Sequence, residues 1–135
     1  MGAASELPRI LVVDDEPAMR EILEIVLTTE GWPVEVAASA EEGLERCREH
    51  DFDLVVLDYW LPGLTGLEVA RRLREGGCTT RIVIFSACVD PELAVAGREV
   101  DARVIDKLDW KELVRVCGDV AGARAARAQF AVRHR

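Results

Sequence analysis

The sequence predicts an α/β protein built on a doubly wound, five-stranded parallel sheet. Short apolar runs alternate five times with segments of helical periodicity along the 135 residues. Residues 54–57 and 82–85 are apolar at every position, which is typical of central strands that helices bury on both faces. Polar residues follow the ends of several runs, and a parallel sheet gathers such positions at one edge.

Each element has its own sequence signal. We expect strands at residues 9–13, 34–37, 53–57, 81–85 and 102–105, and helices at 17–29, 40–49, 66–74, 91–97 and from 110 onward. Capping residues mark four helix starts, at Ser39, Thr65, Asp90 and Asp109. Gly31, the pair at 76–77 and Gly97 are expected to end helices. Right-handed crossovers with one reversal of winding give the strand order 2-1-3-4-5.

The length allows one domain with a single core and leaves no room for a second folded domain of ordinary size. We expect the domain at residues 1–117, with its core at 9–117. Residues 118–135 are rich in Ala and Arg, and we expect them to form a helical extension or an interdomain linker.

Composition excludes several classes of protein. The formal net charge of −8 argues against nucleic-acid binding by the body of the domain, and the four Arg at residues 119–135 are expected to form a solvated helix face. Four widely spaced cysteines and two histidines indicate neither a disulfide framework nor a zinc site. No apolar stretch approaches the roughly 20 residues of a membrane span, and the start lacks the regions of a signal peptide. We therefore expect no membrane insertion and a cytoplasmic location.

Five polar residues stand where the predicted strands end: Asp14, Asp15, Asp58, Ser86 and Lys107. Three crowded carboxylates favour a divalent cation, and Mg²⁺ takes oxygen ligands while leaving positions open for phosphate oxygens. A lysine and a hydroxyl can hold the other oxygens of a phosphoryl group. The set therefore predicts a phosphoryl-transfer centre. Taken singly, each residue also fits a helix cap, a turn or a surface charge.

The same residues resemble the receiver domains of bacterial two-component response regulators. The resemblance rests on ILVVDDEP at 10–17, DLVVLDYWLPGLTGLE at 53–68, IVIFSA at 82–87 and Lys107, and it covers about residues 9–117. It implies a flavodoxin-like three-layer sandwich. It also implies a signalling domain that catalyses only its own phosphorylation and dephosphorylation.

The resemblance assigns a role to each site residue. Asp58 would be the phosphoacceptor, supplied by a histidine kinase or a phosphotransfer protein. Mg²⁺ would be bound by Asp15, Asp58 and the backbone carbonyl of Trp60, with Asp14 acting through a metal-bound water.

The remaining residues of the set would convert phosphorylation into a signal. Lys107 would pair with a phosphoryl oxygen, and movement of Ser86 toward the phosphoryl group would switch the face formed by the last two helices and the last strand. The expected partners of that face are an output protein or an attached effector domain, and a second copy of the chain.

Four positions affect how the resemblance is interpreted. Leu108 replaces the proline that usually follows the lysine, which favours a trans peptide bond there, and Val104 replaces an aromatic residue that usually reports the switch. Trp60, two residues after Asp58, either shields the phosphoryl group from water or forms an exposed recognition surface. Cys88 is a candidate redox-sensitive thiol, although nothing in the sequence lowers its pKa.

Two other function classes fit part of the sequence. A pseudo-receiver, signalling by protein interaction without phosphorylation, is favoured by Val104 and Leu108 and opposed by the complete acidic site. A phosphatase or phosphotransferase typically has an acid two residues after its nucleophile, where this chain has Trp60, so turnover of an external substrate is disfavoured.

Overall fold

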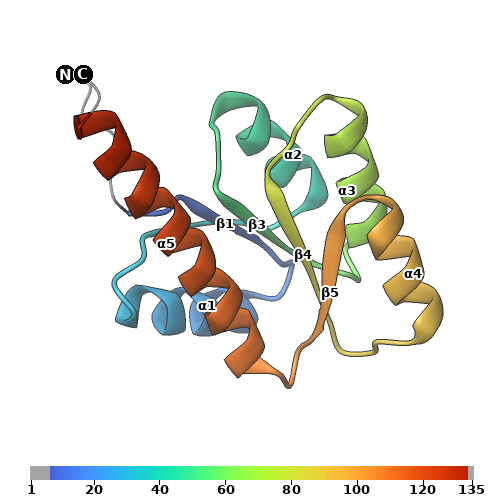
Figure 1. Cartoon of the computed structure of the whole chain (residues 1–135). Coiled ribbons are helices and arrows are strands. Elements are labelled where there is room, and N and C mark those ends of the chain that lie inside the picture. The colour runs from blue at the N-terminus through green and yellow to red at the C-terminus, as the bar shows by residue number, and fades with distance from the viewer. Residues whose placement is uncertain (1–6, 134–135) are drawn as a thin grey trace.

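The computed structural model describes residues 7–133. Its single parallel sheet contains β1 (Ile10–Val13), β2 (Val34–Ala37), β3 (Leu54–Asp58), β4 (Arg81–Ser86) and β5 (Ala102–Asp106). The helices are α1 (Pro17–Thr29), α2 (Ala40–Glu49), α3 (Gly66–Glu75), α4 (Pro91–Glu99) and α5 (Trp110–Arg133). The strand order β2-β1-β3-β4-β5 confirms the predicted topology (Figure 1).

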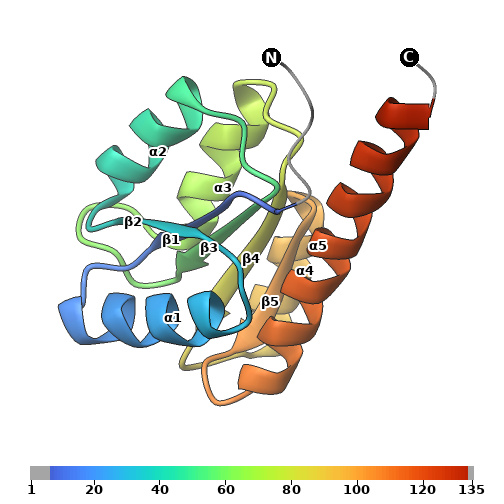
Figure 2. The same ribbon diagram turned by 90° about the vertical axis from the view of Figure 1, so that its left-hand side faces the viewer.

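Helices cover both faces of the sheet, so the molecule has three layers. Helices α1 and α5 lie on one face, and α2, α3 and α4 lie on the other (Figure 2). Along β3, Leu54 and Val56 pack into the core beneath α1 and α5, whereas Val55 and Leu57 pack into the core on the opposite face. This alternation explains why the central strands are apolar at every position.

The predicted capping residues are confirmed at the starts of α2, α3, α4 and α5. The side chains of Ser39 and Thr65 accept hydrogen bonds from the backbone N–H groups of Glu42 and Glu68, and Asp90 does the same for Leu93. At α5, the Asp109 carboxylate accepts from the N–H of Glu112 at 3.2 Å. Each cap satisfies a backbone donor that the first helical turn leaves free.

Some predicted boundaries were wrong by one or two residues. Strand β3 begins at Leu54 and includes Asp58, while β4 includes Ser86, because Asp58 pairs in register with Phe85 and Ser86 with Asp106. Backbone pairing within the sheet therefore fixes the positions of Asp58 and Ser86.

Gly97 was expected to end a helix, and this prediction was wrong. The residue lies buried inside α4. A Cβ at this position would stand 2.8 Å from Cγ2 of Val104 and 3.0 Å from the carbonyl oxygen of Ala102. The glycine is therefore explained by close packing of α4 on β5. At Gly31 and Gly77, φ values of 89° and 86° match the predicted helix stops.

Helix α5 runs for 24 residues, without interruption across the boundary expected at residue 117. Arg124 and Arg127 form ion pairs with Asp53, at 3.4 and 3.1 Å, so the expectation of a purely solvated arginine face was wrong for these two. Arg135 lies outside the described residues. Among helices in the described part, none combines the length and apolarity needed to cross a bilayer.

Candidate phosphoacceptor site

The strand order brings the predicted site residues to one edge of the sheet. Asp58 and Ser86 are the last residues of β3 and β4, and Lys107 directly follows β5. Asp14 and Asp15 follow β1, which the reversal of winding places beside β3. Residues separated by up to 93 positions along the chain thus meet in space.

Three carboxylates form an acidic cluster at this edge. Carboxylate oxygens of Asp14, Asp15 and Asp58 all lie within 4.8 Å of one another. The side chains of Asp14 and Asp58 are buried, with exposed fractions of 2% and 7%, and Asp15 is exposed. An all-oxygen set with one face open to solvent suits a hard divalent cation such as Mg²⁺.

Lys107 links two of the three acids. Its Nζ lies 2.9 Å from Oδ1 of Asp58 and 3.4 Å from Oδ2 of Asp14. Its backbone N–H donates to the carbonyl oxygen of Ser86 at 2.8 Å, which ties the residue to the end of β4. The peptide bond to Leu108 is trans, as expected without a proline, since the described residues contain no cis bond.

The surroundings of Asp58 and Lys107 raise the pKa of both groups, for different reasons. Burial raises the pKa of the Asp58 carboxyl, and the charge of Asp14 adds to the rise, while the hydrogen bond from Lys107 opposes it. For Lys107, burial favours a lower pKa, but the hydrogen bond to Asp58 and the charges of Asp14 and Asp58 outweigh burial and raise the pKa. Lys107 therefore keeps its positive charge at neutral pH. A bound cation would further stabilise the ionised form of the neighbouring Asp58 carboxylate.

Ser86 is buried and hydrogen-bonded within its own loop. Its Oγ donates to the carbonyl oxygen of Cys88 at 2.8 Å and accepts from the N–H of Cys88 at 3.2 Å. Reaching a phosphoryl group on Asp58 would require the hydroxyl to exchange these bonds for a new one. The structure thus places Ser86 at the correct strand end, with its hydroxyl engaged elsewhere.

Trp60 lies beside the site, and its side chain is 66% exposed. Its ring packs edge-on against Tyr59, with centroids 4.8 Å apart. Tyr59, Trp60 and Cys88 line a cavity of about 290 Å³ between the loops that follow β3 and β4. The proposed role of the Trp60 carbonyl as a metal ligand stays a prediction.

Two neighbours of the acidic cluster were not assigned roles from the sequence. The Arg20 guanidinium donates to the carbonyl oxygen of Asp14 at 2.8 Å. A Cβ on Gly66 would stand 2.4 Å from the carbonyl oxygen of Asp58, so only glycine allows α3 to begin this close to β3. The family motif at 53–68 contained Gly66, but no local signal distinguished Arg20 from other surface arginines.

A parallel α/β sheet with an acidic cluster and a lysine at its carboxyl edge is the arrangement that the sequence motifs predicted. The family model of the response regulator receiver domain matches residues 10–113. The chain therefore belongs to the receiver domains of two-component response regulators. This confirms the family inferred from its motifs, and the predicted flavodoxin-like fold.

Individual relatives agree with the family match. The response regulator ArlR of Staphylococcus aureus is 34% identical over 110 residues, which cover 80% of this chain and 50% of the relative. The chain thus spans about half the length of this curated relative. A two-component response regulator of the LuxR family from Aurantimonas is 30% identical, with a TM-score of 0.79, covering 96% of this chain and 99% of that chain.

A third relative has been solved in two functional complexes. TrrA of Thermotoga maritima, in complex with Mg²⁺ and BeF, is 33% identical, with a TM-score of 0.75, covering 84% of this chain and 99% of that chain. The same protein has been solved in complex with the histidine kinase ThkA, with the same identity and TM-score, covering 84% of this chain and 98% of that chain.

Proposed function

We propose that this receiver domain accepts a phosphoryl group on Asp58 from a histidine kinase or a phosphotransfer protein, with Mg²⁺ as cofactor. The observation that carries the proposal is the position of Lys107, whose ammonium contacts both Asp58 and Asp14 at the mouth of the acidic cluster. The complex of TrrA with a histidine kinase and the complex with Mg²⁺ and BeF support the partner and the cofactor.

The transfer needs little covalent chemistry from the protein. A carboxylate oxygen of Asp58 attacks phosphorus, the P–N bond to the donor imidazole breaks, and its electron pair stays on the leaving nitrogen. Lys107 holds a phosphoryl oxygen, and the neighbouring acids Asp14 and Asp15 with Asp58 would bind Mg²⁺. When bound, Mg²⁺ neutralises the charge that gathers around the phosphoryl oxygens.

The output of the domain follows from the same geometry. Phosphorylation on Asp58 offers Ser86 a new acceptor in place of the carbonyl of Cys88, and the loop between β4 and α4 moves with it. We propose that the resulting change on α4, β5 and α5 reaches an output protein or an attached effector domain. We further propose residues 1–117 as the receiver domain, with residues 118–135 as its helical extension.

Intact-mass spectrometry tests the proposal. The parent, incubated with Mg²⁺ and acetyl phosphate or a phosphohistidine donor, should gain one phosphoryl mass. Asp58→Asn should gain none, and Asp51→Asn, which changes an exposed aspartate outside the site, should behave as the parent. An adduct that survives in Asp58→Asn would refute Asp58 as the acceptor. No adduct with either donor would identify the chain as a pseudo-receiver.

A further inference from the structure

A second site is suggested by a cavity far from the phosphoacceptor edge. The cavity has a volume of about 760 Å³ and lies where β4 and β5 begin, between α4 and α5. Asp58, Ser86 and Lys107 stand at the opposite ends of the strands. Cavities that bind small molecules usually measure roughly 300–1,000 Å³, so this one is large enough for a nucleotide.

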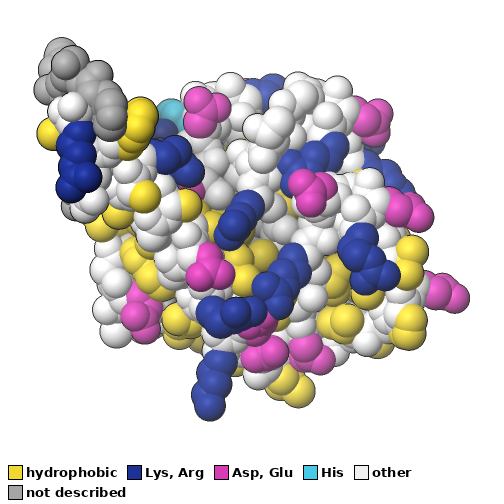
Figure 3. Space-filling view, viewed as in Figure 1, with side chains coloured by type: hydrophobic (Ala, Val, Ile, Leu, Met, Phe, Trp, Pro, Cys, Tyr) yellow, Lys and Arg dark blue, Asp and Glu magenta, His cyan; other side chains and the backbone are white. Residues whose placement is uncertain are grey.

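Positive charge is concentrated around this cavity in an otherwise acidic protein. The formal net charge of the chain is −8, yet four Arg and two Asp line the cavity: Arg74, Arg81, Arg98, Arg103, Asp101 and Asp119. Figure 3 shows Lys and Arg side chains gathered beside α5, around a hollow floored by hydrophobic atoms. An anion is therefore favoured here over the rest of the surface.

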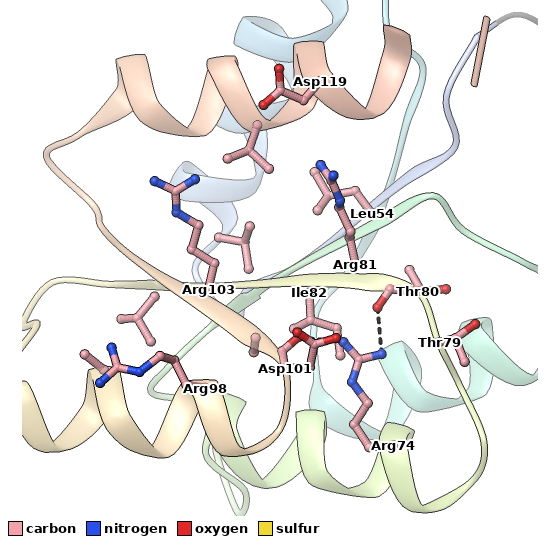
Figure 4. Close-up of a pocket in the computed structure, with 15 residues that line it drawn as sticks. Leu54, Arg74, Thr79, Thr80, Arg81, Ile82, Arg98, Asp101, Arg103 and Asp119 are labelled. Atoms are coloured by element: carbon pink, nitrogen blue, oxygen red, sulfur yellow. Dashed lines mark hydrogen bonds between the residues drawn. The ribbon is translucent and has the colours of Figure 1, made fainter. Parts of the chain in front are cut away.

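Two of the arginines lie on the same face of the sheet. Val83 of β4 pairs in register with Arg103 of β5, and Arg81 lies two residues before Val83, so Arg81 and Arg103 share one face of the sheet. Both side chains extend toward α5, where Asp119 lies (Figure 4). The Arg81 side chain is exposed and has no ion pair or hydrogen bond among the described residues, whereas Arg103 pairs with Glu112.

A third arginine holds the wall of the cavity in place. The guanidinium of Arg74 donates to the carbonyl oxygens of Val100, Asp101, Cys78 and Thr80, at distances of 2.7 to 2.9 Å. Asp101 adopts a left-handed backbone with a φ of 53°, a conformation that aspartate tolerates and that often occurs in ligand sites. This wall is therefore built before any ligand arrives.

The chemistry of the lining matches a ligand with three distinct parts. Arginine forks bind phosphate oxygens in pairs, and guanidinium planes stack on flat rings. The side chains of Leu54, Val83 and Val116 line the cavity but are buried, with exposed fractions of 0%, 1% and 5%, so the flat ring of a ligand would stack on a guanidinium instead. Asp119, opposite the arginines, can accept hydrogen bonds from sugar hydroxyl or ring amino groups but would repel a simple phosphate.

We propose that this cavity binds a nucleotide, with its phosphates on Arg81 and Arg103, its ring stacked on a guanidinium of the arginine-rich lining and its donor groups toward Asp119. The proposal goes beyond phosphorylation of Asp58 and does not depend on it. Because the cavity is bounded by α4, β5 and α5, an occupant would contact the same elements that carry the phosphorylation signal.

Isothermal titration of the full chain with ATP, in EDTA to keep nucleotide off the acidic cluster, tests the proposal. ATP should bind at one site, and Arg81→Gln and Arg103→Gln should each weaken binding at least about tenfold. Arg72→Gln removes an exposed arginine outside the cavity and is the control for Arg81→Gln. Arg115→Gln also removes an ion pair to Glu112 and is the control for Arg103→Gln. Both controls should retain parental affinity.

Further titrations separate nucleotide from other anions. Inorganic triphosphate should bind at least about tenfold more weakly than ATP, because it lacks the ring and the donor groups. The proposal is overturned if ATP does not bind at millimolar concentration, if triphosphate binds equally well, or if the control variants lose as much affinity. It is also overturned if a Glu-rich peptide binds and ATP does not, since the cavity would then dock a protein. Retained ATP binding by Asp58→Asn would show independence from the phosphoacceptor.

Discussion

Lys107 occupies its position in the site although the next residue is Leu108 rather than proline. The turn that follows is held by other bonds, from the N–H of Leu108 to the Asp106 carboxylate at 2.8 Å and from the N–H of Asp109 to the Asp106 carbonyl. The side chain of Leu108 is 88% exposed, so the residue contributes its backbone rather than its packing. Replacement of the proline therefore leaves the ammonium in contact with Asp58.

The replacement of the usual aromatic residue by Val104 has a larger structural effect than the replacement of the proline by Leu108. Its side chain is half-buried and packs on Gly97 of α4, where no space remains for even a methyl group. A β-branched side chain in such a contact has little rotational freedom. If Asp58 is phosphorylated as proposed, we expect coupling of the site to α4 through the loop that contains Ser86, rather than through the rotation of an aromatic ring at position 104.

Our hypothesis is that the Trp60 indole shields the phosphoryl group on Asp58 from water and so lengthens its lifetime. We expect Trp60→Asn to lose phosphate from Asp58 several-fold, roughly 3- to 10-fold, faster than the parent, because a polar side chain admits water where an indole excludes it. The decay of the phosphorylated mass after removal of the donor measures this rate. Trp60→Phe keeps an aromatic ring and should stay near the parental rate. If Trp60→Asn decays no faster than the parent, the exposed indole is instead a recognition surface.

At the scale of elements, the junction of β3 and α3 depends on one close approach. In Gly66→Ala, the new Cβ would overlap the carbonyl oxygen of Asp58, so the backbone that carries Asp58 must shift. We expect a loss of about 1–3 kcal/mol in the free energy of unfolding and slower phosphorylation. Urea denaturation and intact-mass kinetics measure the two effects.

Gly122→Ala is the matched control for this change. Gly122 lies on an exposed turn of α5, with no heavy atom within 4 Å of a Cβ built at the position. Alanine should therefore raise stability by about 0.5–1 kcal/mol and leave phosphorylation unchanged. Equal behaviour of the two alanine variants would show that the contact between Gly66 and Asp58 has no energetic weight.

One carboxylate contributes polar contacts that attach the extension of α5 to the body of the domain. Asp53, only 9% exposed at its side chain, accepts from the N–H of Arg9 at 2.8 Å and pairs with Arg124 and Arg127. These contacts connect the second half of α5 to the starts of β1 and β3. The extension is thus a docked part of the fold, although no local sequence pattern indicates where it binds.

We expect Asp53→Asn to lower the free energy of unfolding by about 1–3 kcal/mol, because the two guanidinium groups lose their charged partner. Amide hydrogen exchange should increase in the second half of α5 more than in the sheet. Asp51→Asn alters an exposed neighbour and should change neither quantity. Unchanged exchange in α5 of Asp53→Asn would mean that apolar contacts, such as those of buried Val120, hold the extension without the ion pairs.

For the whole molecule, the acidic cluster is a source of instability that a cation should relieve. Burial and neighbouring charge raise the pKa of Asp58, so its ionised form is disfavoured in the folded state. We expect Mg²⁺ to raise the melting temperature by a few °C, since ligand at about tenfold its dissociation constant adds about 1.4 kcal/mol. Thermal denaturation with and without EDTA measures the shift.

The shift should be much smaller in Asp15→Asn, which loses one member of the cluster. An exposed acid elsewhere, such as Glu75, serves as the control, and Glu75→Gln should keep the parental response. An equal response to Mg²⁺ in all three proteins would assign the stabilisation to general screening of the net charge rather than to the acidic cluster.

The sequence alone determined the fold class and the strand order, and it predicted which residues form the site. Strand and helix periods, together with caps such as Ser39 and Thr65, are local properties that the structure reproduces within two residues. Position at a strand end was enough to select Asp58, Ser86 and Lys107, because parallel strands share one carboxyl edge.

Only the tertiary structure decided what depends on distances between remote segments. It showed Lys107 between two acids, Gly97 inside a helix because Val104 packs against it, and Asp53 as the partner of two arginines more than 70 residues away. No local sequence pattern predicts these contacts, because each depends on how the helices pack against the sheet. The arginine-lined cavity between α4 and α5 has the same origin. The cavity is created by packing, and no sequence motif marks the residues that line it.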